Sequence, residues 1–363
     1  MLRTSGLRRP EKACLRIQRI PKSLERRGFM SITAKELARR LNISETAVSL
    51  ALNNKPGISQ KRKKEILAEA EKAGYDFTRV KHRRQLNGSV CFLIYRKHGA
   101  VVSDTPFFAE LYEGIQETCR ELDLKLRIRT VFEGDDTREQ LEAVRYDDIS
   151  GMIVLATEMQ KEDLNWFSDL PFPAVFLDAC FLSLPYDAVV IDNVQGAYTA
   201  VSYLIRKTRT QPGYLRSAYS ISNFEERADG FYKAVRENGL SAGKSPVHRL
   251  TPSVEGAYED MKALLKEGLE PARSYFADND LIAIGAVRAF QEAGYDIPKD
   301  ISIAGFDNLP IGNYIKPSLS TVNVPKKAMA SLAVTRLKEI MTARQHVPVR
   351  ILTGVSLVRR DSV

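Results

Sequence analysis

Long apolar runs are absent from this 363-residue sequence, and residues with metal or redox chemistry are rare. No run approaches the roughly 18 apolar residues that a membrane-spanning helix needs, so we expect no membrane association. The four cysteines (Cys14, Cys91, Cys119 and Cys180) form no CxxC pair and have no metal-ligand spacing with the four histidines. This pattern argues against a metal or cofactor site and favours reduced, mostly buried thiols in a cytoplasmic protein.

Motifs of the common enzyme classes are also missing. The sequence has no GxSxG, no HExxH, no Walker loop and no GxGxxG after its first expected strand. We therefore expect no enzymatic activity and name no catalytic residue.

Positive charge is concentrated at one end of the chain. Residues 1–88 contain 22 Lys/Arg and 8 Asp/Glu, whereas residues 89–363 contain 32 Lys/Arg and 37 Asp/Glu. A basic segment on an acidic body is typical of a nucleic-acid-binding domain joined to a domain of another kind.

Three short helices are predicted within residues 32–74. Thr33 and Glu36 form a capping-box pattern, Ser44 and Ser59 stand at the starts of the second and third helices, and Gly74 follows the third. The 3.6-residue period places small apolar side chains on one face of the middle helix, Glu45–Asn53, and mostly short polar ones on the other. This pattern favours a helix-turn-helix that presents its middle helix to the DNA major groove, although a three-helix module that binds nothing has similar local features.

The segments on either side of these helices are basic. Residues 1–29 contain no convincing element; they read as a disordered arm, a targeting peptide or, as we favour, a non-native extension upstream of a true start at Met30. Residues 76–88 include the run from Arg79 to Arg84, which we interpret as a linker that contacts DNA phosphates rather than only a solvated surface.

From Ser89 onward, apolar strands alternate with amphipathic helices, which implies parallel sheets covered on both faces. We expect two doubly wound lobes, with ligands bound beyond the carboxyl ends of the strands. The predicted strands are Val90–Tyr95, Leu126–Val131, Gly151–Ala156, Ala174–Leu177, Ala188–Ile191, Arg216–Ile221, His248–Thr251, Ser274–Ala277, Ile301–Gly305 and Ser320–Val322. The predicted helices are Phe107–Leu122, one around Arg138–Val144, Gly196–Ile205, Ala228–Asn238, Ala257–Gly268 and Leu281–Ala293.

Short motifs along residues 30–363 occur in the order found in the LacI/GalR family of transcriptional regulators, which the sequence resembles. Each is weak alone, and the series is specific: Ala47-Val48-Ser49, Leu52 to Gly57, Gly74-Tyr75, Phe176-Leu177-Asp178, Asp192-Asn193, Gly196-Ala197, Glu226 to Phe231, Ala277 to Asp280, Pro298 to Asp307, Ser320-Thr321-Val322 and Leu357 to Ser362.

The resemblance implies an all-α helix-turn-helix head (30–75), a hinge (76–88) and a periplasmic-binding-protein-like α/β body (89–363) with two doubly wound parallel-sheet lobes. One lobe would contain about 89–190 and 322–350, and the other about 191–321 and 351–363, with three crossings between them. It further implies a homodimer, bound to double-stranded operator DNA in the cytoplasm at the nucleoid, with a small effector, most simply a carbohydrate, held between the lobes.

Residues of the head are assigned to DNA by type and position. Thr46 and Ser49 can hydrogen-bond base edges or phosphates, and Glu45 can accept from a cytosine amino group. Leu50 stands where many relatives have arginine, so it would pack on a thymine methyl unless it is a partly buried edge residue. The expected phosphate contacts near helix ends are Asn53, Ser59, Lys61 and Arg62.

Residues of the body are assigned to the effector by their match to the family. Asp178, Asn279 and Asp307 can hydrogen-bond hydroxyl groups, and Arg227 offers a fork for hydroxyls, ring oxygens or a carboxylate. Asp307 and Asn279 are also suited to a turn or a helix cap, and Arg227 to an ion pair at the lobe crossover. The aromatic candidates for stacking, which core packing explains equally well, are Phe107, Phe108 and Phe276.

Two other functions fit parts of this sequence. The body alone fits a transport-type sugar receptor, but such a receptor needs export, and we expect no secretory signal before the basic head. An activator would differ from a repressor only in where its operator lies. The sign of the effector response is also open, because it depends on which state the effector prefers.

The linker provides the first testable prediction. Relatives wedge a leucine of an Ala-Leu-Ala segment into the minor groove; here the matching stretch is Arg79-Val80-Lys81, and a short β-branched valine is a weak wedge. Val80→Ala should therefore change operator bending by less than about 10°, a small part of the 20–90° kinks that inserted side chains produce. Circular-permutation gel shifts measure the angle, and a clear loss of bend would contradict this interpretation.

Overall fold

The computed structural model describes residues 32–52, 57–75, 88–102, 106–134, 136–145, 147–167, 170–181, 183–343 and 345–363. Residues 1–76 and 77–363 belong to two compact units, a head and a body, and each is described by itself. The N-terminal segment 1–29 lies outside the described residues.

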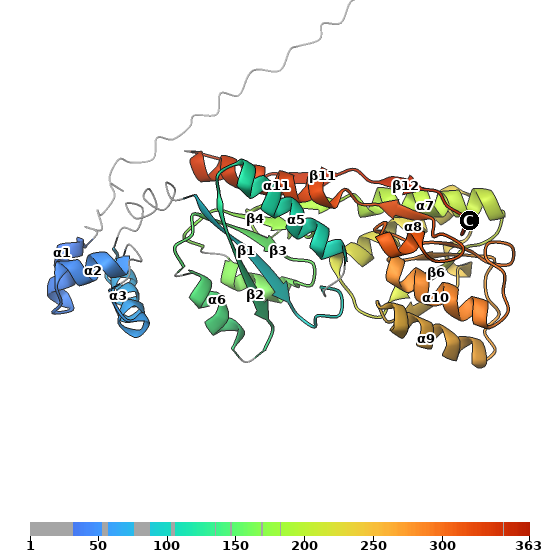
Figure 1. Ribbon diagram of the computed structural model, residues 1–363, viewed down its shortest axis with the longest axis horizontal. Helices are drawn as coiled ribbons and strands as arrows, with labels where there is room; N and C mark the ends of the chain where they lie inside the picture. The colour runs from blue at the N-terminus through green and yellow to red at the C-terminus, as the bar shows by residue number, and fades with distance from the viewer. Residues whose placement is uncertain are drawn as a thin grey trace, which may run out of the picture. The chain divides into compact units, whose positions relative to one another are not determined.

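The head contains three helices that begin and end where the capping residues predict (Figure 1): α1 (Ala34–Arg40), α2 (Glu45–Leu52) and α3 (Gln60–Lys72). The Thr33 hydroxyl accepts the Glu36 N–H at 3.2 Å, and the Glu36 carboxylate accepts the Thr33 N–H at 2.7 Å, which confirms the capping box. The hydroxyls of Ser44 and Ser59 each accept a backbone N–H three residues on. Gly74 follows α3 with a φ of +70°, a left-handed conformation that glycine adopts without strain.

The apolar face of α2 forms the centre of the head. Val48, Ala51 and Leu52 are at most 2% exposed and pack between α1 and α3, whose Leu37 and Ile66 are also buried. Because these small side chains occupy the inner face, the opposite face of α2 is available to solvent.

The body contains two parallel sheets. The first has six strands in the order β11 (Arg350–Thr353), β5 (Asp187–Ile191), β4 (Ala174–Leu177), β3 (Gly151–Leu155), β1 (Ser89–Arg96) and β2 (Lys125–Phe132). Figure 1 shows α5 (Pro106–Glu121) and α11 (Lys326–Thr342) side by side over this sheet. The other face packs against α6 (Thr137–Arg145) and the 3-10 helix η1 (Lys161–Phe167). The two faces separate along β1, where Val90 and Phe92 join one core, and Cys91 and Leu93 join the other.

The second sheet has the order β7 (Val247–Leu250), β6 (Gly213–Ser217), β8 (Ser274–Ala277) and β9 (Ser302–Ala304). Its faces are covered by α7 (Asn193–Thr208) and α8 (Ser222–Glu237), and by α9 (Val254–Lys266) and α10 (Asp280–Glu292). An antiparallel ribbon of β10 (Thr321–Asn323) and β12 (Ser356–Val358) lies beside α7. Two short 3-10 helices precede the ribbon in the chain: η2 (Ala242–Lys244) comes after α8, and η3 (Pro310–Asn313) comes after β9. Helices on both faces of both sheets confirm the doubly wound α/β class.

The chain crosses between the two lobes at three places, after β5, after β10 and after β11. One apolar core runs through the crossings, because α5 and α11 of the first lobe share it with α7 and α8 of the second. The lobes are therefore packed on each other around the crossings, and their relative orientation depends on that packing.

The structure differs from the sequence predictions in four elements. Residues 350–353 extend the first sheet as β11. Residues 351–353 therefore belong to the first lobe, although residues 351–363 were expected in the second. Strand β6 ends at Ser217 instead of Ile221, and α8 begins at Ser222 instead of Ala228. Ile221 stands at the N-cap of α8 without a side-chain cap hydrogen bond, so the usual helix-start signal is missing there. The long helix α11 was not among the predicted elements.

Within the part of the chain that the structure describes, every helix is too short or too polar to cross a lipid bilayer.

The contact between α7 and α8 gives a stability prediction. A Cβ on Gly230 would lie 2.4 Å from the Val194 carbonyl oxygen and 2.9 Å from the Ala197 Cβ. Gly230→Ala should therefore force α8 away from α7 and lower the Tm by roughly 2–10 °C. The matched control is Gly243→Ala, whose added methyl group meets nothing within 4 Å. Thermal unfolding at one protein concentration measures both, and equal Tm values would contradict the prediction.

Candidate functional site

The outward face of α2 has the exposure that its sequence predicts. Glu45, Thr46 and Ser49 are exposed, and Leu50 is half-buried. The Leu50 Cδ1 atom lies only 3.3 Å from where a Cβ on Gly57 would stand, so this leucine packs on the loop after α2. The contact of Leu50 with a thymine methyl group stays a prediction.

The expected phosphate contacts have different surroundings. Lys61 is exposed, and the Ser59 hydroxyl serves as the N-cap of α3. The Arg62 guanidinium forms an exposed ion pair with Glu65 at 2.8 Å, which a phosphate would have to replace or share. Asn53, Arg79 and Val80 lie outside the described residues.

A pocket opens in the body, where the carboxyl ends of strands from both sheets meet. Thr157 and Asp178 come after β3 and β4 of the first sheet, and Asn279 and Asp307 come after β8 and β9 of the second. The remaining lining comes from helices and loops and is mostly apolar: Val101, Phe107, Phe108, Ile221, Asn223, Phe224, Arg227, Pro252, Leu281 and Leu309. The pocket thus brings together Asp178, Arg227, Asn279, Asp307 and Phe107 of the sequence-predicted site.

Phe276 was a wrong prediction. It is fully buried in β8, and its ring packs against Tyr214 and stacks on Phe231 inside the core. Parallel strands covered on both faces bury every side chain, so the sequence did not show toward which side this ring points. In contrast, Phe107 and Phe108 contact each other edge to face, with ring centroids 5.1 Å apart, at the pocket wall.

Arg227 connects α8 to both the crossover and the strand ends. Its Nε donates to Asn193 Oδ1 at 2.9 Å, its Nη1 donates to the Asp278 carbonyl oxygen, and its Nη2 lies 3.1 Å from Asp307 Oδ1. The guanidinium also lies over the Phe306 ring, 3.7 Å from its centroid. Each of the three nitrogens thus has one partner in the protein, and the ion pair is with Asp307 after β9 and not with an acid at the lobe crossover.

Asp178 has the opposite character. Its side chain is buried, Oδ2 accepts the Thr157 hydroxyl at 2.6 Å, and Oδ1 has no hydrogen-bond partner among the residues that the structure describes. Burial raises the pKa of this carboxyl to about 7, although the Thr157 hydrogen bond and the Arg227 charge oppose the shift. A buried carboxylate oxygen without a donor at a pocket wall is a position where a ligand N–H or O–H group can bind.

Asn279 and Asp307 combine structural contacts with their place in the pocket. The Asn279 Oδ1 caps α10 by accepting the Ile282 N–H at 2.9 Å, which fits the cap role considered from sequence. The Asp307 backbone has a φ of +106° and its carbonyl oxygen accepts the buried Lys326 ammonium group at 2.8 Å. Burial raises the pKa of the Asp307 carboxyl, and the charges of Arg227 and Lys326 oppose that shift.

The acids flanking Asn279 are structural. Asp278 accepts the Tyr214 hydroxyl and the Ser217 N–H, and Asp280 accepts the Leu309 N–H and the Thr321 hydroxyl. Both carboxylates are therefore satisfied within the protein, and neither lines the pocket. Within the described residues, no cluster of three or more His, Cys, Asp or Glu side chains is arranged to hold a metal ion.

Two polar pocket residues, Thr157 and Asn223, were missed in the sequence. Thr157 lies two residues after the end of the buried strand β3, a position that could have indicated it. Asn223 lies in the first turn of α8, whose start was placed six residues too late, so no signal led to it.

The fold and the pocket define a helix-turn-helix head joined to a body of the periplasmic-binding-protein type. A family model described as a periplasmic binding protein-like domain matches residues 201–363. The chain is 27% identical over 336 residues to the HTH-type transcriptional regulator GalS of Salmonella typhimurium, covering 92% of this chain and 96% of GalS. It is 26% identical over 335 residues to the repressor PurR of Pasteurella multocida, covering 91% and 98%.

Solved structures with the same fold cover both units. A complex of the transcriptional regulator CelR with cellobiose matches with a TM-score of 0.68 and 19% identity, over 92% of this chain and 100% of CelR. The lac repressor dimer bound to operator and the anti-inducer ONPF matches with a TM-score of 0.67 and 20% identity, over 91% and 98%. The chain is thus similar over more than nine-tenths of its length to HTH-type transcriptional regulators, and it shares the fold of the lac repressor and CelR.

The Asp178 carboxyl gives a pH prediction. Its folded pKa of about 7 lies above the ordinary value of 3.8, so the folded state loses stability as pH rises from about 4 to 7. An amide carries no charge, so Asp178→Asn should raise the Tm at pH 8 by about 5 °C and change it little near pH 4.

The exposed Asp229 on α8 provides the matched control, Asp229→Asn, which should leave the curve of Tm against pH unchanged. Thermal unfolding from pH 4 to 8 measures all three proteins. If the curves of Tm against pH run parallel for Asp178→Asn and the unaltered chain, ionisation of this carboxyl does not lower the stability of the folded state, and the prediction is wrong.

Proposed function

We propose that this protein is a dimeric, sequence-specific DNA-binding repressor whose affinity for its operator is controlled by a small carbohydrate bound between the two lobes. The main observation that supports this proposal is the pocket at the strand ends of both sheets, which has the unpartnered Asp178 oxygen in its wall. The same chain has a helix-turn-helix in which Thr46 and Ser49 are exposed. The proposal places the protein in the cytoplasm, at the nucleoid, and includes no catalysis.

The chemistry of the pocket favours a neutral ligand rich in hydroxyl groups. Asp178 and Asp307 present carboxyl oxygens that accept hydrogen bonds, and the charge of Arg227 is paired with Asp307, so the pocket wall offers acceptors for ligand hydroxyl groups. Phe107 and Phe108 offer apolar surface for the C–H face of a sugar ring. The bound ribose in a LacI family regulator of Enterococcus faecium (24% identical, TM-score 0.64, 76% of this chain and 98% of that one) and the cellobiose in CelR support this class.

The proposed control acts through the orientation of the lobes. A ligand that contacts strand ends of both sheets stabilises the orientation in which both contact it. In a dimer, that orientation sets the separation of the two linkers and hence whether both heads reach half-sites about one helical turn apart. Glu45, Thr46, Ser49 and Leu50 would then face base edges, with Ser59, Lys61 and Arg62 near phosphates.

The test is selection of duplexes from a random library by the full-length protein at about 150 mM salt, where non-specific binding is weak. We expect enrichment of a pseudo-palindromic sequence. D-ribose, D-galactose, cellobiose, adenine and guanine are then added singly, and at least one sugar should change the affinity for the selected duplex tenfold or more, as a coupling of about 1.4 kcal/mol requires.

Thr46→Ala should weaken binding to the selected duplex about tenfold, because a base-edge contact is lost. The control is Thr130→Ala, an exposed threonine on β2 of the body, which should bind normally. Equal binding of selected and random duplexes by the unaltered protein would refute the DNA function.

A further inference from the structure

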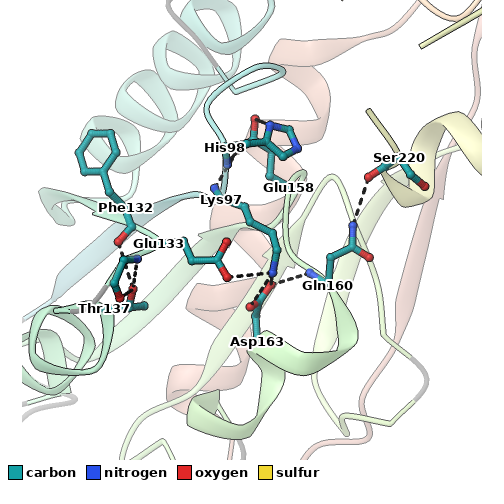
Figure 2. A network of polar contacts seen from close by, with 10 residues as sticks. Lys97, His98, Phe132, Glu133, Thr137, Glu158, Gln160, Asp163 and Ser220 are labelled. Atoms are coloured by element: carbon teal, nitrogen blue, oxygen red, sulfur yellow. Dashed lines mark hydrogen bonds and ion pairs between the residues drawn. The ribbon is translucent and has the colours of Figure 1, made fainter. Parts of the chain in front are cut away.

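Glu158, which was not a predicted site residue, organises the loop that follows β1. Its side chain is fully buried, and its carboxylate accepts five backbone N–H groups of residues 97–102. Figure 2 shows Glu158 beside Lys97 and His98 of this loop. Oε2 accepts from Lys97 at 2.8 Å, His98 at 3.2 Å and Gly99 at 2.9 Å. Oε1 accepts the neighbouring N–H groups, from Val101 at 2.8 Å and Val102 at 2.7 Å.

This arrangement needs an ionised carboxylate. Burial alone would raise the pKa of Glu158, but hydrogen bonds from the backbone of Val102, Val101 and Gly99 lower it below the ordinary value. Five converging N–H dipoles stabilise the anion, and the anion in return fixes the path of a loop that has no regular structure of its own.

The loop and the segment after Glu158 both reach the second lobe. Gln160 Nε2 donates to the Ser220 carbonyl oxygen at 3.2 Å, a contact drawn in Figure 2. The His98 ring lies 4.8 Å from the Tyr219 ring, centroid to centroid. Residues 218–221 connect β6 to α8, and Ile221 lines the pocket on that side, whereas Val101 lines it from the side of the loop.

A second set of charged residues connects Lys97 to Gln160. Lys97 Nζ lies 3.1 Å from both Asp163 and Glu133, and Asp163 also accepts the Gln160 N–H at 2.7 Å. The backbone positions of Lys97 and Gln160 are thereby coupled to each other. Residues 97–102 and 158–163 thus form one connected unit of the first lobe.

We propose that Glu158 is a positioning residue for effector binding: it holds residues 97–102 so that His98 and Gln160 contact Tyr219 and Ser220 of the other lobe and keep the pocket closed around its ligand. This inference rests on the proposed function for the identity of the ligand. We call the contacts between the lobes the clasp (His98 and Gln160 with Tyr219 and Ser220), and none of these four residues lines the pocket. Removing the clasp should therefore open the pocket without altering the residues that line its polar wall.

The first experiment needs no ligand. Hydrogen–deuterium exchange is followed by mass spectrometry in the full chain and in Glu158→Gln, whose amide group would turn N–H donors toward backbone N–H groups. Peptides covering 97–102 should exchange at least tenfold faster, and so should peptides covering 218–222 in the other lobe. The control Glu142→Gln, a half-exposed acid of α6 that pairs with Arg138 and takes no part in these contacts, should leave 218–222 unchanged.

The second lobe is the readout that separates positioning from local stability. If Glu158 matters only for its own loop, exchange rises in 97–102 and not in 218–222, and the proposal is wrong. If Glu158→Gln fails to fold, Gln160→Ala decides instead, because it removes only the contact with Ser220. Unchanged exchange of 218–222 in Gln160→Ala would equally overturn the proposal.

The second experiment measures ligand affinity with a matched pair of glutamines. Gln160 Nε2 bonds a backbone carbonyl across the lobes, whereas Gln211 Nε2 bonds the Ser241 carbonyl oxygen at 3.0 Å within one lobe. Each protein is titrated with D-ribose, D-galactose and cellobiose, and the fluorescence of Trp166, the only tryptophan, reports binding from η1 beside Asp163.

Gln160→Ala should weaken binding about three- to tenfold, through faster dissociation, and Gln211→Ala should not change it. Equal affinities for Gln160→Ala and the unaltered protein would overturn the role of the clasp. If none of the three sugars binds the unaltered protein, the proposed carbohydrate effector is wrong, while the exchange result still decides whether Glu158 positions the clasp.

Discussion

The buried guanidinium of Arg227 is the contact on which the pocket depends. A charge taken out of water needs partners on every side, and Arg227 finds them on three different elements: Asn193 at the crossover, the backbone of Asp278 after β8, and Asp307 after β9. Because α8 carries this arginine, the helix is held against the strand ends of its own sheet. Removing the Asp307 carboxylate would leave this buried charge unpaired, which is strongly destabilising.

The pocket lies where the two sheets share a core, and this determines how a ligand can act at a distance. The apolar core around α5, α11, α7 and α8 is continuous through the three crossings, so a rotation of one lobe must repack it as a unit. Buried Lys326 begins α11 and donates to the Asp307 carbonyl oxygen, while its charge lies 3.6 Å from Glu110 on α5. A change at the pocket wall therefore reaches the two helices of the first lobe through contacts that already exist.

The sequence was informative where a local rule decides the structure. Capping residues located the helices of the head, and the match to the family located Asp178, Asn279 and Asp307, each of which follows an apolar strand. Where no local signal exists, prediction failed: α8 starts at an uncapped Ile221, and Phe276 lies in a strand buried on both faces. Glu158 could not be recognised either, because its partners are backbone N–H groups, which the identities of the side chains do not reveal.

Glu158 and Asp178 show how two equally buried carboxylates acquire different roles. Glu158 has five N–H donors, so its pKa falls and the ionised group is part of the stable fold. Asp178 has one hydroxyl donor and one oxygen without a partner, so its pKa rises and ionisation carries a free-energy cost that a ligand O–H can offset. In the proposed function, a ligand donor would relieve that cost, so the acid with the unpartnered oxygen would respond to the contents of the pocket. The acid with five donors would hold the loop beside the pocket in place, so the number of donors would separate the two roles.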